Sequence, residues 1–139
     1  MIIIDSNIWI DFFKNIENQE TKELSYLLRN KIAVGSNSII VTEVLQGKRE
    51  EKEYQRIKHV LNTFRVYRIN HETILNAGDI FRTCQNGIKE DKNISGKTMK
   101  TCDCIIASSC IENDVMIFSK DKHFKLMAEF FPQLKIFVS

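Results

Sequence analysis

The first thirteen residues constrain the fold of this chain more than any other stretch. Three isoleucines, Ile2–Ile4, run directly into Asp5, two small polar residues and a second apolar segment. An uninterrupted β-branched run is typical of a strand that is covered on both faces in a parallel sheet. Asp5 then stands at the carboxyl end of the strand, where open α/β sheets bind ligands. Ser6 or Asn7 can cap a helix that begins near Ile8. On these residues alone, a strand-ending or capping role explains Asp5 better than a ligand-binding role.

Short apolar runs and helical segments alternate along the rest of the chain. Further strands are expected at 32–34, 64–69, 114–118 and 134–138, and helices at 20–29, 38–47, 48–62, 72–84, 98–113 and 122–130. The resulting order is β-α-α-β-α-α-β-α-α-β-α-β, which predicts an α/β fold with a mainly parallel sheet between helical layers. The polar stretch 86–97 is expected to be a surface loop. The length suits a single domain over residues 1–139.

The composition is that of a soluble globular protein, with 43% hydrophobic and 27% charged residues. Lys and Arg number 20 against 18 Asp and Glu, so a surface for nucleic acid would have to be a local patch. No apolar run approaches the ~20 residues of a membrane span. No basic segment precedes the isoleucine run, as it would in a secretory signal. The cytoplasm is therefore the expected compartment.

The four cysteines are expected to be reduced thiols rather than ligands of a structural zinc ion. Cys102 and Cys104 fall two residues apart in an expected helix, where side chains do not face a common point. His59, His71 and His123 show no ligand spacing to each other or to the cysteines.

Three further acids stand where their surroundings are expected to be apolar. Glu43 lies on or beside the apolar stripe of its helix, and Asp103 lies on an apolar helix face in mid-helix, where capping is not expected. Asp121 follows a buried strand, as the first acid does. A carboxylate in an apolar setting needs an ion pair, a metal or a functional role, and for Glu43 the alternatives stay open. Asp11 and Asp79 are expected to be surface acids.

These acids can meet in one crevice if the strands before Asp5 and Asp121 are neighbours. Four close carboxylates cannot all stay ionised without compensating positive charge. Oxygen ligands favour Mg²⁺ or Mn²⁺, and such ions can activate a water for in-line attack on a phosphodiester. Ser6, Asn7 and Ser119 are suited to orienting a carboxylate or a bound water. The pattern therefore predicts metal-dependent phosphoryl chemistry.

Four segments of the chain together resemble the motifs of PIN-domain ribonucleases, most closely the small VapC-type toxins of bacterial toxin–antitoxin pairs. The segments are DSNIWI at 5–10, SIIVTEVLQG at 38–47, DCIIA at 103–107 and FSKDKHF at 118–124. They occur in the family's order and span the chain from its first strand to its last. The resemblance implies a three-layer α/β/α domain of about five strands with an acidic site for Mg²⁺ or Mn²⁺. The implied ligands are Asp5 and Asp103 directly, with Glu43 and Asp121 completing the site directly or through water.

The same resemblance implies an activity and partners. The activity is endonucleolytic cleavage of single-stranded or looped RNA. The partners are a second copy in a homodimer and a cognate antitoxin that covers the cleft. Six lysines can guide RNA phosphates, although each taken singly is better explained as plain surface. They are Lys89, Lys92, Lys97, Lys100, Lys120 and Lys122.

Three other functions fit parts of the pattern. A housekeeping RNA-processing nuclease would keep the fold but lack an antitoxin. A non-enzymatic regulatory module with an acidic Mg²⁺ pocket would carry an Asp at the end of a middle strand, and the strands at 32–34 and 66–67 end without one. A haloacid-dehalogenase-like phosphatase would need a second acid where Asn7 stands.

Overall fold

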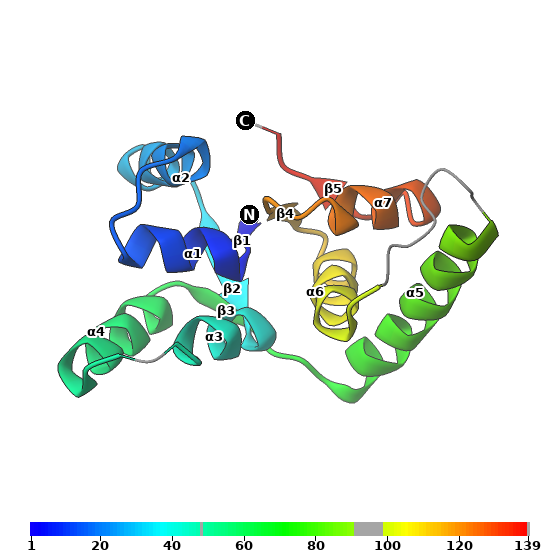
Figure 1. The fold of residues 1–139 in the computed structure, drawn as a ribbon, viewed down its shortest axis with the longest axis horizontal. Coiled ribbons are helices and arrows are strands. Elements are labelled where there is room, and N and C mark those ends of the chain that lie inside the picture. The colour runs from blue at the N-terminus through cyan, green and yellow to red at the C-terminus, as the bar shows by residue number, and fades with distance from the viewer. Residues whose placement is uncertain (48, 91–98, 139) are drawn as a thin grey trace.

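The computed structural model describes residues 1–47, 49–90 and 99–138, and within these ranges five strands alternate with seven helices (Figure 1). The strands are β1 Ile2–Ile4, β2 Val34–Asn37, β3 Arg65–Tyr67, β4 Met116–Phe118 and β5 Lys135–Ile136. The helices are α1 Ser6–Phe13, α2 Gln19–Arg29, α3 Ser38–Leu45, α4 Glu51–Asn62, α5 His71–Glu90, α6 Thr101–Glu112 and α7 His123–Phe130. This is the predicted order of elements.

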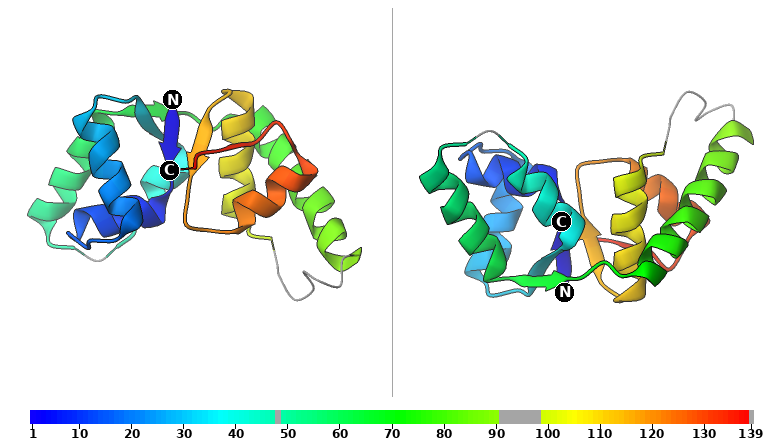
Figure 2. Two further views of the ribbon diagram at one scale, coloured as in Figure 1. Left: turned by 90° about the horizontal axis from the view of Figure 1, so that it is seen from above. Right: turned by 90° about the horizontal axis from the view of Figure 1, so that it is seen from below.

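All neighbouring strands pair in parallel, in the order β3-β2-β1-β4-β5. Helices α1, α2 and α4 lie on one side of the sheet, and α5, α6 and α7 lie on the other (Figure 2). The predicted three-layer α/β/α arrangement is therefore confirmed. Within the described ranges, no helix combines the length and the apolar content that a membrane crossing requires.

The first strand is central and buried, as its isoleucine run predicts. Ile2–Ile4 are all in the core, and Trp9 of α1 stacks on Phe13 with ring centroids 5.8 Å apart. The N-cap of α1 is Asp5, as one expected role of this residue has it, and not Ser6 or Asn7: its side chain accepts the N–H of Ser6 at 2.8 Å. Asp5 is thus the single residue between β1 and α1, which fixes it at the sheet edge.

The second strand lies further along the chain than expected. It spans Val34–Asn37 instead of 32–34, since Ile32 is exposed and the polar residues Ser36 and Asn37 are fully buried. Asn37 is buried because it is also the N-cap of α3, where its Oδ1 accepts the N–H groups of Ile39 and Ile40 at 3.1 and 3.0 Å. The strand and the helix that carries Glu43 are therefore joined without a loop.

The predicted surface loop at 86–97 is wrong over its first part, because α5 continues to Glu90. Its remainder, 91–97, lies outside the described residues. Gly87 is helical, and a Cβ atom at this position would lie 2.2 Å from Cζ of Phe130 in α7. The absence of a side chain at Gly87 lets this aromatic ring pack against the helix backbone.

The buried face of α5 does not include all of its large apolar residues. Ile74 and Leu75 are 43% and 53% exposed. The core-facing residues are instead Thr73, Ala77, Ile80, Cys84 and Ile88. Thr73 is satisfied in this position because its hydroxyl donates to Glu112 at the end of α6 at 2.5 Å.

Candidate active site

The carboxyl ends of β1 and β4 lie side by side, which is the condition under which the predicted acids can meet. Ile4 pairs with Phe118 in the parallel register, and the N–H of Asp5 donates to the carbonyl of Phe118 at 2.9 Å. The residues that follow these two strands, Asp5 and Ser119, therefore emerge at the same edge of the sheet.

A hollow of about 340 Å³ opens at this edge and is lined by all four predicted acids. Asp5 and Asp103 are buried, with 3% and 8% of their surface exposed, and Glu43 and Asp121 are half-buried. The residues that line this hollow are Asp5, Ser6, Asn7, Glu43, Lys100, Thr101, Cys102, Asp103 and Asp121. The structure thus brings together Asp5 from β1, Glu43 from α3, Asp103 from α6 and Asp121 from the β4–α7 connection.

Ser119 links the two acids that follow the strands. Its Oγ donates to Asp5 Oδ2 at 2.5 Å and accepts the backbone N–H of Asp121 at 2.9 Å. Because the backbone N–H of Ser6 donates to the other oxygen of Asp5, both oxygens of this carboxylate are held. Of the three predicted orienting residues, Ser119 and Ser6 contact Asp5 in this way, and Asn7 lines the hollow while remaining exposed.

Asp103 sits in the first turn of α6 and not in mid-helix as expected, because the helix begins at Thr101 instead of 98. It still does not cap the helix: the N-cap is Lys100, which makes no side-chain cap hydrogen bond. Asp103 Oδ2 is buried without a hydrogen-bond partner among the described residues, and Glu43 Oε1 shares this property. Two carboxylate oxygens of the cluster therefore have no hydrogen-bond donor within residues 1–47, 49–90 and 99–138.

Burial and the closeness of the acids to one another raise the pKa values of Asp5, Glu43 and Asp103. Burial raises the pKa of Asp103 to about 6, with further contributions from the charges of Asp121 and Asp5. The pKa of Glu43 is also raised, first by burial and then by Asp5. Burial raises the pKa of Asp5, although the hydrogen bond from Ser119 opposes this. The charge of Lys100 lowers the pKa values of Glu43 and Asp103, but it does not offset the effect of burial among the described residues.

The donor set fits a hard divalent cation. Its members are carboxylate oxygens, which suit Mg²⁺ and Mn²⁺, and two of these oxygens lack any other partner in the described part of the chain. A cation bound among Asp5, Glu43, Asp103 and Asp121 would satisfy those oxygens and offset the charge that raises their pKa values.

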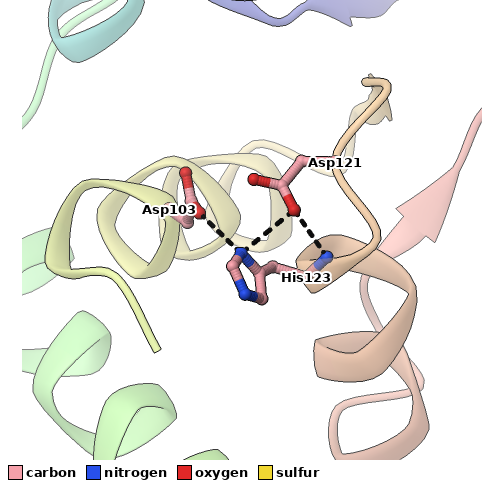
Figure 3. A group of neighbouring side chains, drawn as sticks. All are labelled: Asp103, Asp121 and His123. Carbon is pink, nitrogen blue, oxygen red and sulfur yellow. Dashed lines mark hydrogen bonds and ion pairs between the residues drawn. The ribbon is translucent and has the colours of Figure 1, made fainter. Parts of the chain in front are cut away.

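His123, the first residue of α7, is a site residue that the sequence analysis missed. Its Nδ1 lies 3.0 Å from Asp121 Oδ1 and 3.4 Å from Asp103 Oδ2. Figure 3 shows the ring turned toward both carboxylates. Its backbone N–H also donates to Asp121 Oδ1 at 2.9 Å. The spacing of His123 to the other histidines and to the cysteines does not reveal this role. The available signal was the position of His123 two residues after Asp121.

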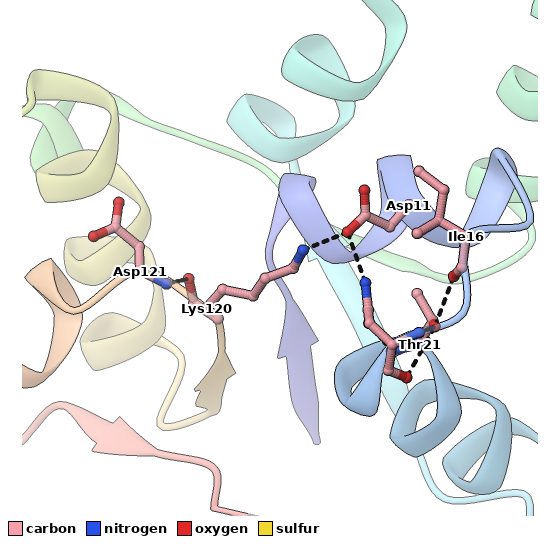
Figure 4. Close-up of polar contacts among 7 residues, drawn as sticks. Asp11, Ile16, Thr21, Lys120 and Asp121 are labelled. Carbon is pink, nitrogen blue, oxygen red and sulfur yellow. Dashed lines mark hydrogen bonds and ion pairs between the residues drawn. The ribbon is translucent and has the colours of Figure 1, made fainter.

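Asp11 is half-buried and structurally engaged, not the plain surface acid that was expected. It accepts hydrogen bonds from Lys120 Nζ and from Asn18 Nδ2, the latter at 3.0 Å (Figure 4). The hydrogen bond from Lys120 holds the pKa of Asp11 below its ordinary value. Lys120 is therefore occupied in tying the segment after β4 to α1. Asp79 is exposed, as expected.

The other lysines differ in their relation to the site. Lys100 lines the acidic hollow. Lys89 and Lys122 are exposed on α5 and before α7, and Lys92 and Lys97 lie outside the described residues.

A second and larger hollow, of about 860 Å³, lies between α1, α2 and α4 and contains none of the four acids. Its apolar lining comes from Phe12, Phe13, Ile16, Leu28 and Val60. Its basic lining comes from Lys22, Arg29 and Arg56, and Cζ of Arg56 lies 6.0 Å from the centroid of the Phe13 ring. Its size and its apolar floor suit a protein segment better than a nucleotide.

Comparison with known proteins places these features in a family context. The family profile described as PIN domain matches residues 2–129. A VapC ribonuclease of Mycobacterium bovis is 25% identical over 132 residues, which cover 92% of each chain.

Solved structures show the same fold. A chain of FitAB bound to a DNA fragment superposes with a TM-score of 0.72 at 17% identity, covering 99% of this chain and 94% of that one. A chain of VapBC2 from Rickettsia felis, bound to a promoter DNA fragment, gives a TM-score of 0.66 at 17% identity, covering 99% and 98%.

Proposed function

Because the chain belongs to the PIN domain family, we propose that it is a Mg²⁺- or Mn²⁺-dependent endoribonuclease and the toxin of a toxin–antitoxin pair. The observation that carries the proposal is the convergence of Asp5, Glu43, Asp103 and Asp121 on one hollow, where two of their oxygens lack a hydrogen-bond partner in the described part of the chain. A structural ion-pair network would satisfy those oxygens with cationic side chains. A relative named as a VapC ribonuclease supports the activity.

The four acids differ in burial, and we assign their roles accordingly. When bound, a divalent ion supplies Lewis-acid stabilisation of the phosphodiester charge and an activated water nucleophile. Asp5 and Asp103, which are buried, hold the ion in a fixed place, since Asp5 is locked by Ser119 and Ser6. Glu43 and Asp121 are half-exposed and complete the site on the side from which a substrate enters.

The mouth of the hollow is suited to a phosphate backbone. Lys100 is exposed at this mouth, and its charge acts on both Glu43 and Asp103, whose pKa values it lowers against the effect of burial. A cation beside an acidic, metal-binding hollow can hold an RNA phosphate without reading its bases. Two of the acids are buried, so the substrate class that we assign is single-stranded or looped RNA, whose unpaired backbone can reach into the hollow.

The larger hollow between α1, α2 and α4 supports the second part of the proposal. An apolar floor with Lys22, Arg29 and Arg56 around it is complementary to an amphipathic segment that carries acidic residues. A neighbour described as a toxin–antitoxin complex supports an antitoxin as the protein that supplies this segment. In this proposal the antitoxin binds the larger hollow in addition to covering the acidic cleft, and the expected homodimer and cytoplasmic location belong to the same proposal.

The direct test is cleavage of a defined panel of RNA oligonucleotides by the purified protein. We expect cleavage with Mg²⁺ or Mn²⁺ and none after a chelator removes the ions. Internal cuts in unpaired regions identify an endoribonuclease, whereas cleavage that persists in chelator would refute the metal role. A short upstream reading frame whose product binds the chain and stops cleavage distinguishes a toxin from a housekeeping nuclease.

A further inference from the structure

His123 stands out among the described residues because its ring nitrogen lies between two acids without a hydrogen bond to either. Nδ1 is 3.0 Å from Asp121 Oδ1 and 3.4 Å from Asp103 Oδ2. Both Nδ1 of His123 and Oδ2 of Asp103 are nevertheless buried atoms that lack a hydrogen-bond partner within the described residues. His123 Nδ1 therefore lies close to Asp121 Oδ1 and Asp103 Oδ2, but the geometry at the ring nitrogen is not that of a hydrogen bond to either oxygen.

The spacing of these atoms is that of ligands around one ion. Two donors that each bind an ion at about 2.1 Å lie about 3.0 Å apart at a right angle and about 3.4 Å apart at a tetrahedral angle. The two distances from His123 Nδ1 have these values, and all three donor atoms lie within 4.8 Å of one another. Figure 3 shows the nitrogen of the ring turned toward both carboxylates.

The local backbone holds His123 in this position. It is the first residue of α7, and its own N–H donates to Asp121 Oδ1 at 2.9 Å. The next residue, Phe124, is buried in the core, which anchors the start of the helix. The imidazole is therefore presented to the acids by the same turn that orients Asp121.

We propose that His123 Nδ1 is a further ligand of a divalent ion held by Asp103 and Asp121, and that it makes this position prefer Mn²⁺ and similar transition-metal ions over Mg²⁺. The inference rests on the proposed metal-dependent function and adds a nitrogen to a site otherwise made of oxygens. Imidazole binds first-row transition ions well, whereas Mg²⁺ favours oxygen ligands and keeps its waters. The preference thus follows from the ligand type and not from the charge of the site.

The rival role for His123 is that of a positioning residue that only holds the two carboxylates by charge. The variant His123→Asn removes both the imidazole and any charge it carries, and metal selectivity separates the two roles: a positioning role affects Mn²⁺ and Mg²⁺ binding alike, whereas loss of a nitrogen ligand weakens Mn²⁺ binding more. As a ligand, His123 predicts a loss of Mn²⁺ affinity of about tenfold or more in this variant, with Mg²⁺ affinity changed less than about threefold. His59→Asn, at an exposed position of α4, is the matched control and should change neither.

The measurement is metal binding without RNA. Mn²⁺ affinity is obtained by EPR titration of the full chain, Mg²⁺ affinity by competition, and nitrogen ligation by pulsed EPR on protein labelled with ¹⁵N-histidine. We expect a histidine nitrogen coupling in the wild type and the His59→Asn control that is lost in His123→Asn. Absence of the coupling in the wild type, or equal losses of Mn²⁺ and Mg²⁺ affinity in His123→Asn, would overturn the ligand role.

RNA cleavage by the same Mn²⁺-loaded wild type separates this inference from the proposed function. Cleavage without a histidine coupling overturns the ligand role of His123 and leaves the ribonuclease intact. A histidine coupling without cleavage of any RNA supports the ligand role and counts against the ribonuclease.

Discussion

The hydroxyl of Ser119 donates a hydrogen bond of 2.5 Å to Asp5 Oδ2 across 114 residues of chain. The same oxygen of Ser119 accepts the N–H of Asp121 at 2.9 Å. One small side chain thereby sets the separation of two acids that come from different strands. The geometry of the candidate active site depends on this contact as well as on the acids themselves.

Loss of the buried acids should abolish activity while leaving the fold intact. We expect Asp5→Asn and Asp103→Asn each to lower RNA cleavage by at least about 100-fold, since even groups that only orient metal ligands are worth 10- to 100-fold. Cleavage assays and circular dichroism on the same preparations check this. Asp79→Asn, at an exposed position of α5, is the control and should cleave normally. Retained metal-dependent cleavage by either site variant would refute the assignment.

Ser119→Ala tests the link between the two acids. Without its hydroxyl, Asp5 loses one of its two fixed contacts and the N–H of Asp121 loses its acceptor. We expect about a 10- to 100-fold loss of metal affinity, measured by calorimetry, and a loss of about 1–2 kcal/mol in the free energy of unfolding. Thr63→Ala is the control, because that hydroxyl donates only to the Val60 carbonyl at the end of α4. Unchanged metal affinity in Ser119→Ala would show that the acids hold their positions unaided.

The raised pKa of Asp103 predicts a pH-dependent stability. Its folded-state pKa of about 6 lies above the ordinary 3.8, so the folded protein favours the protonated acid. The stability contributed by Asp103 is therefore complete below about pH 4 and is lost as the pH rises through about 6. We expect metal-free Asp103→Asn to melt at a higher temperature than the wild type at about pH 7.5 and at a similar temperature at about pH 4.

Mg²⁺ should reverse that difference at the higher pH, because it binds only the wild-type site and stabilises the folded state. Thermal melts of the wild type and Asp103→Asn, with Mg²⁺ and with chelator, measure both effects. If Asp103→Asn melts below the wild type in chelator at both pH values, the ionised Asp103 carboxylate does not destabilise the metal-free protein.

The larger hollow, a groove between α1, α2 and α4, should bind the antitoxin without taking part in cleavage. Arg56→Glu reverses a charge that lies beside the Phe13 ring in this groove, and we expect antitoxin affinity to fall about tenfold or more. Lys58→Glu, an exposed residue of the same helix outside the groove, makes the same charge change and is the control. Surface plasmon resonance with the cognate antitoxin and RNA cleavage assays measure the two properties. Equal loss of binding in both variants would point to general charge attraction.

Two glycines of α5 allow a matched test of the α5–α7 contact. Gly78→Ala meets open space and should raise the free energy of unfolding by about 0.5–1 kcal/mol through helix propensity. Gly87→Ala places a methyl group against the Phe130 ring and should instead lower it by about 1–3 kcal/mol. Denaturant unfolding measures both. Adding Phe130→Leu should recover part of the loss in Gly87→Ala, and failure to do so would mean that the ring does not cause it.

Much of this architecture was readable from the sequence because its signals are local. The order of elements and the burial of Ile2–Ile4 follow from runs and spacings of apolar residues, and so does the unusual placement of Glu43 and Asp103. The errors arose where a local signal had a tertiary cause. Gly87 is typical of a loop, but it lies in helix α5. A glycine stands there because an aromatic ring of α7 occupies the space that a side chain would need.

By itself the sequence predicted a parallel α/β sheet with two acids after strands and two on helices, since the alternation of segments and the type of each residue can be read along the chain. Only the tertiary structure decided that β1 lies beside β4, which brings Asp5 and Ser119 into contact. It also decided that the ring of His123 faces Asp103 and Asp121. These relationships depend on strand order and on the packing of α7 against α6. Sequence periodicity shows which face of an element is apolar, but not which distant residues of the chain lie close together in space.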